Sequence, residues 1–362
     1  FAPSKILLIT DVGIVKAGVA APAQSAIEKN GYKFDVFDGC QPEAPISVIE
    51  ELNQKIRTKR YDLLIGLGGG STMDTTKVAS VTATSGLSIS DLMKSQLAKR
   101  VIAKILIPTT AGTGSEWSNV AVVTDDINIK PSQTRIIVSP QNFANAVIVD
   151  PELTLNLPQK ITAESGMDAL IHAIEAYTSP LATIMSDMFA ETAIKLISSN
   201  LRQVYAQGNK NIKSRTNLSI AASLAMHAAV LSSVGLAHFM NVPLGKKAQI
   251  AHGSACYVLL PAVMEFNIVS NPAKYAKVAE LMGENVKGLS VLEAAAKSVE
   301  AVKKLAIDLG MPQKSDVKIT DDDINAMVDE LYAFQGPILN IQNPRNVTRE
   351  DAKRIYITAL RG

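Results

Sequence analysis

An aspartate and a histidine share an otherwise apolar segment near the middle of the chain. Asp168 and His172 are four residues apart in SGMDALIHAIEAY (165–177). In a helix, residues four apart lie one above the other on the same face. Both side chains are common metal ligands, so together they could supply half of a metal site. A hydrogen bond within the helix, or an acidic residue near the helix start beside an unrelated histidine, would explain the same pair.

Two further histidines offer the other half of such a site. His238 and His252 are fourteen residues apart, and we interpret the Pro-Leu-Gly segment between them (243–245) as a turn that brings both imidazoles together. Three imidazole nitrogens and one carboxylate oxygen suit Fe²⁺ or Zn²⁺ and leave room for a substrate oxygen. The remaining histidine, His227, lies in the apolar stretch LAMHAAVL. We expect it to be a buried, hydrogen-bonded residue or a pocket wall rather than a ligand.

Two turns rich in small residues predict a nucleotide site. IGLGGGSTMD (65–74) follows a strand-like run and opens a helix. Its glycines allow close approach of the backbone, and free N–H groups at a helix start favour a phosphate. Ser71 takes the place of the third glycine of G-x-G-x-x-G, so the fingerprint is incomplete. PTTAGTGSEW (108–117) follows another strand, and Asp11 at the end of the first strand is either a ribose ligand or a solvated carboxylate.

The order of elements predicts two domains. Strand-like and helical segments alternate over residues 1–155, which predicts an α/β domain with a parallel doubly wound sheet, and this domain contains both nucleotide turns. Residues 156–362 show helical periodicity with little β-branched alternation, which predicts an all-α second domain, and this domain contains the candidate metal ligands. The expected strands are 5–11, 32–38, 62–67, 104–110 and 146–153; the expected helices include 16–30, 46–60, 161–178, 186–206, 214–231, 289–309 and 321–334.

Composition excludes several other functions. The net charge is only +2, and the basic clusters are short, so we expect no nucleic-acid partner. The two cysteines, Cys40 and Cys256, form no CxxC pattern and fit a reducing compartment. We find no leader sequence and no uninterrupted apolar run of about 18 residues. We therefore expect a cytoplasmic protein that does not bind a membrane.

A series of motifs resembles the iron-containing (group III) alcohol dehydrogenase family. They are, in order, GGGSTMDTTK, PTTAGTGSE, DPELT, GMDALIHAIEAY, GLAHFMNVPLG, AHGSACYVLLPAVMEFN and NPRNVTREDAKRIY. The resemblance covers essentially the whole chain. It implies the dehydroquinate synthase-like fold, in which an N-terminal dinucleotide-binding domain precedes a helical domain.

The resemblance also implies the residues of the site. The family's metal ligands carry over to Asp168, His172, His238 and His252, with Fe²⁺ as the expected ion and Zn²⁺ as the alternative. No catalytic residue beyond the metal site is implied. Cofactor contacts carry over to Asp11, Gly69, Gly70, Ser71, Thr109, Thr110 and Thr113. The charge of Asp11 would repel a 2′-phosphate, so NAD is expected in preference to NADP.

The implied activity is reversible oxidation of a short primary alcohol or diol, such as 1,3-propanediol, 1,2-propanediol or butanol, to its aldehyde. Val242 departs from the family pattern, because many members have a proton-relaying histidine there. The alternatives are a zinc-dependent polyol (glycerol-type) dehydrogenase, a dehydroquinate synthase-like lyase, and a non-catalytic nucleotide-binding relative. The expected partners are a small alcohol or aldehyde and further copies of the chain, in a homodimer or larger homo-oligomer.

Overall fold

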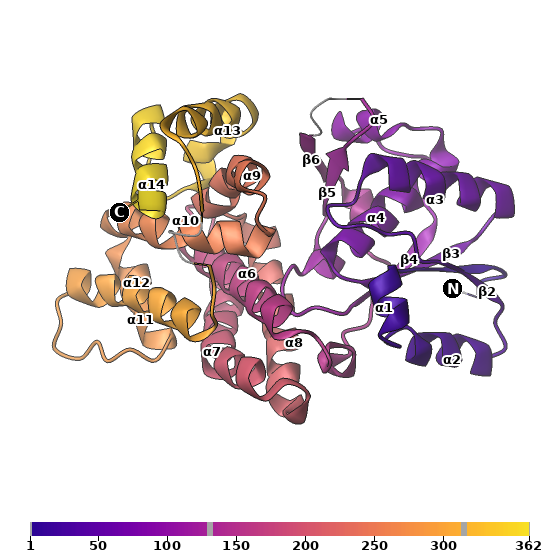
Figure 1. Cartoon of the computed structure of the whole chain (residues 1–362), viewed down its shortest axis with the longest axis horizontal. Coiled ribbons are helices and arrows are strands. Elements are labelled where there is room, and N and C mark those ends of the chain that lie inside the picture. Colours follow the sequence, from indigo (N-terminus) through magenta and orange to yellow (C-terminus); the bar gives the residue numbers. More distant parts are fainter. Residues whose placement is uncertain (1, 129–132, 313–316, 362) are drawn as a thin grey trace. The chain divides into compact units, whose positions relative to one another are not determined.

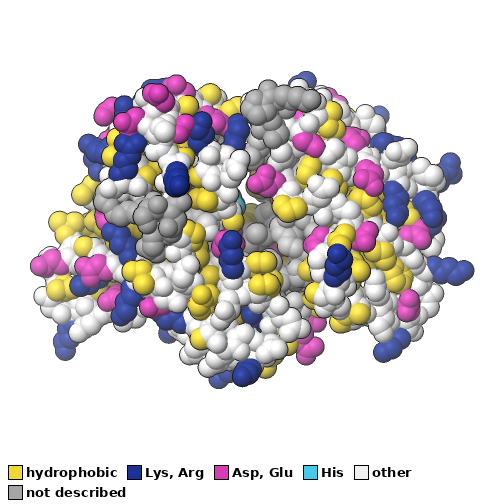
Figure 2. Space-filling model, viewed as in Figure 1, with side chains coloured by type: hydrophobic (Ala, Val, Ile, Leu, Met, Phe, Trp, Pro, Cys, Tyr) yellow, Lys and Arg dark blue, Asp and Glu magenta, His cyan; other side chains and the backbone are white. Residues whose placement is uncertain are grey.

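The chain forms two compact units (Figure 1). The structure is a computed structural model that describes residues 2–128, 133–312 and 317–361. The first unit contains residues 1–110 and 114–154, and the second contains residues 111–113 and 155–362. On the face shown in Figure 2, basic and acidic side chains are interspersed, as expected for a nearly neutral chain.

A parallel five-stranded sheet forms the centre of the first unit. Its strand order is β2-β1-β3-β4-β7, and every neighbouring pair is parallel. The strands are β1 (Ile6–Ile9), β2 (Phe34–Phe37), β3 (Leu63–Gly68), β4 (Ala103–Pro108) and β7 (Ala146–Val147). The helices are α1 (Val12–Lys16), α2 (Ala21–Lys29), α3 (Ile46–Lys59), α4 (Gly70–Ser85) and α5 (Ile89–Met93). The predicted α/β class with a parallel sheet is confirmed.

Some predicted elements of this unit were wrong in extent. The helix expected over 16–30 is α2, which begins only at Ala21, and a short additional helix, α1, capped by Asp11, precedes it directly after β1. The strand expected over 146–153 is only two residues long and is followed by a 3₁₀ turn at Pro151–Thr154. The ladder ends where the Ile148 N–H donates to the Leu106 carbonyl at 3.0 Å, and Pro151, which has no N–H to donate, opens the 3₁₀ turn.

An antiparallel hairpin was missed altogether. Strands β5 (Val120–Asp125) and β6 (Gln133–Val138) pair with each other in a separate two-stranded sheet. Its inner residues are Ala121, Val123 and Ile137, which are buried, while Val122, Ile136 and Val138 next to them are exposed. Short alternating strands of this kind carry a weak periodic signal.

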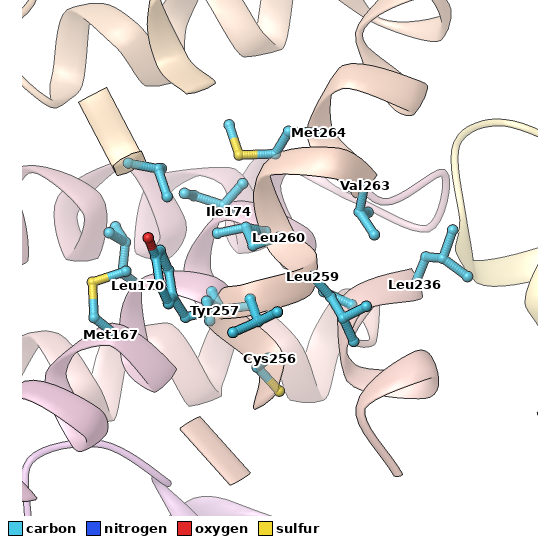
Figure 3. Close-up of a cluster of buried hydrophobic side chains, with 14 of the residues drawn as sticks. Met167, Leu170, Ile174, Leu236, Cys256, Tyr257, Leu259, Leu260, Val263 and Met264 are labelled. Atoms are coloured by element: carbon cyan, nitrogen blue, oxygen red, sulfur yellow. The ribbon is translucent and has the colours of Figure 1, made fainter. Parts of the chain in front are cut away.

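The second unit is helical. Its helices are α6 (Gln159–Thr178), α7 (Ile184–Gln207), α8 (Ile212–Ser232), α9 (Leu236–Ala248), α10 (His252–Asn267), α11 (Pro272–Leu281), α12 (Val291–Asp308), α13 (Asp321–Gln342) and α14 (Arg349–Arg361). One continuous hydrophobic cluster joins them, and α6 and α10 contribute much of it. Figure 3 shows part of this cluster, including Met167 and Leu170 of α6 with Leu260 and Met264 of α10.

Helix α10 is apolar because it lies in the middle of this cluster. Together with the turn that follows it, it is long and apolar enough to cross a membrane, but 78% of that stretch is buried inside the structure. Helices α8 and α9 pass the same test only as a pair, and they are bent by 106° at the break between them. Burial of this extent is typical of the central helix of a packed core.

The turn expected at residues 243–245 lies elsewhere. Pro243 is inside α9, which continues to Ala248 and ends at Gln249 in the left-handed conformation, with φ 53°. The return therefore occurs over residues 249–251, immediately before α10. Pro243 is buried, and packing of its helix within the core overrides the low helix propensity of proline.

Candidate functional site

The four candidate metal ligands come from three helices of the second unit. Asp168 and His172 lie on α6, four residues apart, and both are buried. His238 lies in the first turn of α9, and His252 is the first residue of α10. The first turns of α9 and α10 thus lie against the middle of α6.

The structure brings the donor atoms of these residues together. Asp168 Oδ1 lies 3.5 Å from His238 Nε2 and 3.6 Å from His252 Nε2, and Asp168 Oδ2 lies 4.0 Å from His172 Nδ1. The rings of His172 and His238 are stacked, with centroids 4.4 Å apart. The His252 side chain is 53% exposed, so an ion or a substrate can reach the donors from that side.

Three of these atoms are the kind of buried polar group that requires a partner. Asp168 Oδ1, His172 Nδ1 and His238 Nε2 are buried and have no hydrogen-bond partner within the described residues. Leaving such atoms unsatisfied costs about 1–3 kcal/mol each. A divalent cation among them would satisfy all three, and nitrogen and carboxylate donors suit iron and zinc. The residues present therefore fit a metal ion.

Glu175 is a part of the site that sequence reasoning missed. Its carboxylate accepts hydrogen bonds from His238 Nδ1 at 2.5 Å, from the N–H of Gly235 at 2.9 Å and from the N–H of Ala237 at 2.6 Å. It thereby holds the start of α9 and leaves His238 Nε2 facing Asp168. Metal-binding histidines generally donate their other N–H to such a partner. The available signal was spacing, because Glu175 lies seven residues after Asp168 on the same helix face.

The remaining contacts at the site fix His252. The Asn241 side-chain amide hydrogen-bonds to His252 Nδ1 at 2.8 Å, which orients the ring from the other side. Gly253 follows His252, and a Cβ there would lie 2.5 Å from the backbone oxygen of Glu164 on α6. Only glycine allows the start of α10 to approach α6 so closely.

The electrostatics of the cluster also suit a cation. Burial lowers the pKa of His172 to about 4, so this ring is neutral at pH 7, the form that binds a metal. Burial opposes protonation of His238 as well, but the carboxylates of Glu175 and Asp168 outweigh it and raise the pKa of His238 to about 9. Burial raises the pKa of Asp168, yet the neighbouring histidines hold it below its usual value. The two buried carboxylates thus favour a positive charge between them, which protonated His238 supplies and which a bound divalent cation would replace.

Replacing Glu175 with glutamine should weaken metal binding by roughly 10- to 100-fold, the usual cost of losing an outer partner of a metal-binding histidine. Glutamine has a neutral amide in place of the carboxylate, so the negative charge that accepts from His238 Nδ1–H and from two backbone N–H groups is lost. Competition with a chelator would measure the affinity. The matched control is Glu191→Gln, whose carboxylate accepts from the Tyr177 hydroxyl and from no histidine. Equal affinities for both variants would contradict the role of Glu175.

The predicted nucleotide turns lie at one edge of the parallel sheet. Gly68 at the end of β3 pairs with Pro108 at the end of β4, and Ile9 at the end of β1 pairs with Gly66 of β3. The segments that leave these three strands therefore start side by side at their carboxyl ends. Ligands of open α/β sheets bind at this edge.

The backbone of the two turns is in direct contact. The N–H of Thr109 donates to the carbonyl of Gly68 at 3.0 Å. A Cβ on Gly69 would lie 3.7 Å from Thr110 Cγ2. Gly69 caps α4 without a side chain and Gly70 is its first residue, so N–H groups at the helix start are available to an anion.

The other candidate cofactor residues have varied surroundings. Ser71 Oγ accepts from the Glu43 N–H at 3.0 Å. Asp11 is neither free nor simply solvated, because its Oδ1 accepts from the Ile14 N–H at 3.0 Å and caps α1. Thr113 belongs to the second unit and not to the first. Six of the seven candidates, Asp11, Gly69, Gly70, Ser71, Thr109 and Thr110, thus lie in the first unit, where the three strands end.

A buried lysine below these turns also escaped sequence reasoning. Lys77 of α4 is completely buried and contacts the Asp74 carboxylate at 3.2 Å, Ser115 Oγ at 2.6 Å, Ser118 Oγ at 3.1 Å and the Val120 carbonyl at 2.8 Å. Asp74 in turn accepts from Ser115 and from the N–H of Val122. These bonds tie the end of the second turn to the helix that follows the first.

Glu116, in the same region, should make stability depend on pH. Burial raises its pKa to about 7 from an ordinary 4.5, so the folded state binds a proton that the unfolded state has lost. The stabilisation that comes from protonated Glu116 is fully present below pH 4.5 and is lost as the pH rises through 7. We expect the free energy of unfolding of Glu116→Gln, relative to the unmodified protein, to increase between pH 5 and pH 8 in urea titrations. The exposed Glu152→Gln is the control, and parallel pH curves for Glu116→Gln and the unmodified protein would refute the expectation.

The fold and the two candidate sites suit a metal-dependent enzyme that uses a dinucleotide. Residues 1–151 match the family profile described as iron-containing alcohol dehydrogenase, and residues 162–360 match that of the Fe-containing alcohol dehydrogenase family, C-terminal. The chain belongs to the iron-containing alcohol dehydrogenase family. It is therefore an oxidoreductase that interconverts alcohols and aldehydes with a nicotinamide cofactor and a metal.

Individual relatives agree with this assignment. The chain is 34% identical to long-chain-alcohol dehydrogenase 1 of Geobacillus thermodenitrificans, over 99% of this chain and 90% of that one. It is 35% identical to 1,3-propanediol dehydrogenase of Klebsiella pneumoniae, over 98% and 91%. The crystal structure of sulfoacetaldehyde reductase from Bifidobacterium kashiwanohense in complex with NAD⁺ superposes with a TM-score of 0.87, at 28% identity, over 99% and 91%.

Proposed function

We propose that the protein interconverts a short primary alcohol or diol, such as 1,3-propanediol, 1,2-propanediol or butanol, and the corresponding aldehyde, with NAD(H). The observation that carries the proposal is the cluster of buried, unpartnered donor atoms on Asp168, His172 and His238. The named substrates of the relatives range from long-chain alcohols to 1,3-propanediol. The proposed substrate lies at the short end of this range.

In this proposal Asp168, His172, His238 and His252 hold the metal. A divalent ion there would supply Lewis-acid polarisation of the alcohol or carbonyl oxygen. Glu175 keeps His238 in the tautomer that leaves Nε2 for the ion, and Asn241 orients His252. Val242, one turn after His238 on α9, can neither donate nor accept a proton. The reaction proton must therefore leave through other groups.

The cofactor would lie on the carboxyl edge of the sheet. The N–H groups around Gly69, Gly70 and Ser71 would bind its pyrophosphate, since they open α4 with no side-chain cap. Asp11 would accept from the ribose hydroxyls, and its negative charge favours NAD over NADP. The domain boundaries that go with these roles are 1–155 for the cofactor and 156–362 for the metal and substrate. Thr109, Thr110 and Thr113 complete the proposed set.

Metal content and turnover test the proposal together. We would purify the protein anaerobically, measure iron and zinc, and follow NADH oxidation with propanal, butanal, lactaldehyde and 3-hydroxypropanal. We expect about one metal ion per chain, and loss of both the metal and the activity in His252→Ala. The matched control is His227→Ala, because His227 hydrogen-bonds to Ser223 of its own helix at 2.7 Å. Metal and full activity in the His252 variant would contradict the assignment.

We also propose that the protein is cytoplasmic and forms a homodimer or larger homo-oligomer. Light scattering during size-exclusion chromatography would measure the mass of the assembly. A monomer at micromolar concentration would refute the assembly.

A further inference from the structure

Cys256 lies at the same cluster as the candidate metal ligands. It follows His252 by four residues on α10, so both side chains project from one face of that helix. Its Sγ is 3.7 Å from His252 Nε2, and the residue is fully buried. In Figure 3 the sulfur points away from the Leu260 and Met264 side chains of the hydrophobic cluster.

The distances suit coordination of a single ion. One ligand atom each of Asp168, His238, His252 and Cys256 can be chosen so that all four lie within 4.8 Å of one another. Zinc binds nitrogen at about 2.0–2.1 Å and sulfur at about 2.3 Å. Two such atoms bound to one zinc ion at ligand angles of about 90–120° are therefore about 3.1–3.8 Å apart. The 3.7 Å between the sulfur and His252 Nε2 falls within this range.

Two other atoms point to an ion at this place independently of the cysteine. Asp168 Oδ1 and His238 Nε2 belong to buried side chains, lie 3.5 Å apart and have no hydrogen-bond partner within the described residues. Asp168 presents Oδ1 to His238 and His252, and presents Oδ2 to His172. The sulfur therefore adds to the donors on the Oδ1 side.

We propose that Cys256 is a further protein ligand of this metal centre and that its sulfur biases the centre toward a thiophilic ion, Zn²⁺, over Fe²⁺. Soft thiolate donors select zinc, whereas imidazole and carboxylate donors accept either ion. On binding, a Zn–S bond forms, the S–H bond breaks and the proton passes to solvent, with no change of oxidation state. The inference rests on the proposed metal centre and specifies which ion it takes.

Spectroscopy of the full chain tests the proposal without relying on activity. X-ray absorption at the zinc edge of the unmodified protein should show a sulfur neighbour at about 2.3 Å. Substitution with Co²⁺ should give a thiolate-to-cobalt charge-transfer band in the near ultraviolet. We expect both signals to vanish in Cys256→Ala and to persist in Cys40→Ala, which removes the other buried free cysteine. The affinity for zinc relative to iron should fall by more than about 10-fold in Cys256→Ala.

The outcomes separate this inference from the proposed function. Zinc bound at one ion per chain with only nitrogen and oxygen neighbours would overturn the role of Cys256 and leave the metal centre standing. Failure of the unmodified protein to bind either metal would overturn the metal centre and the cysteine ligand together. If Cys256→Ala does not fold, the sulfur neighbour in the unmodified protein still decides the question.

Discussion

Replacing Asp168 with asparagine should abolish both metal binding and activity. Asp168 is central to the cluster, because its two oxygens face the nitrogens of His172, His238 and His252. The amide has the same shape but no charge, so it cannot balance a divalent cation in a buried site. The loss should exceed the roughly 10- to 100-fold cost of losing an outer-shell partner. Metal analysis and NADH oxidation at saturating aldehyde would measure it.

The control for this substitution is Asp187→Asn on α7. That carboxylate pairs with Lys274 at 2.7 Å, is partly exposed and contacts no histidine. It should keep its metal and its turnover. An Asp168→Asn protein that retained one metal ion per chain and normal activity would show that the ion is bound elsewhere.

Replacing Lys77 with methionine should cause the largest loss of stability. The substitution leaves the Asp74 carboxylate without its buried cation, and breaking such a pair costs about 3–5 kcal/mol. Ser115, Ser118 and the Val120 carbonyl also lose their bond to the ammonium. Urea denaturation followed by circular dichroism would measure the free energy of unfolding. NADH binding should weaken too, because the end of the second turn loses its bonds to the Lys77 ammonium and retains the bond from Ser115 to Asp74.

A double variant tests whether the cause is the unpaired charge. Removing both partners of a buried pair costs far less than removing one. Asp74→Asn combined with Lys77→Met should therefore recover part of the loss. Lys297→Met, which breaks an exposed pair with Glu300, should leave the unfolding midpoint almost unchanged. If Lys77→Met is as stable as the Lys297 variant, the buried pair does not stabilise the protein.

The sequence alone was sufficient for the class of fold and for the family. Alternating strands and helices before residue 155 and helical periodicity after it are local signals, because burial on a sheet face or a helix stripe repeats every few residues. The i,i+4 spacing of Asp168 and His172 has the same local origin, since helix geometry alone places them on one face. The glycine turns could be predicted because a run of small residues between a strand and a helix is a local signal. It allows a tight turn and leaves backbone N–H groups free at the helix start.

Only the tertiary structure decided which distant residues meet. Glu175 contacts His238, which is 63 residues away, and Lys77 reaches Ser115 and Ser118. No periodic pattern encodes these contacts, because they depend on the packing of separate helices. The same holds for the position of the turn before α10, where burial of Pro243 inside α9 outweighed its local preference. The pKa shifts of His172 and His238 likewise arise from desolvation and from charges that folding brings together.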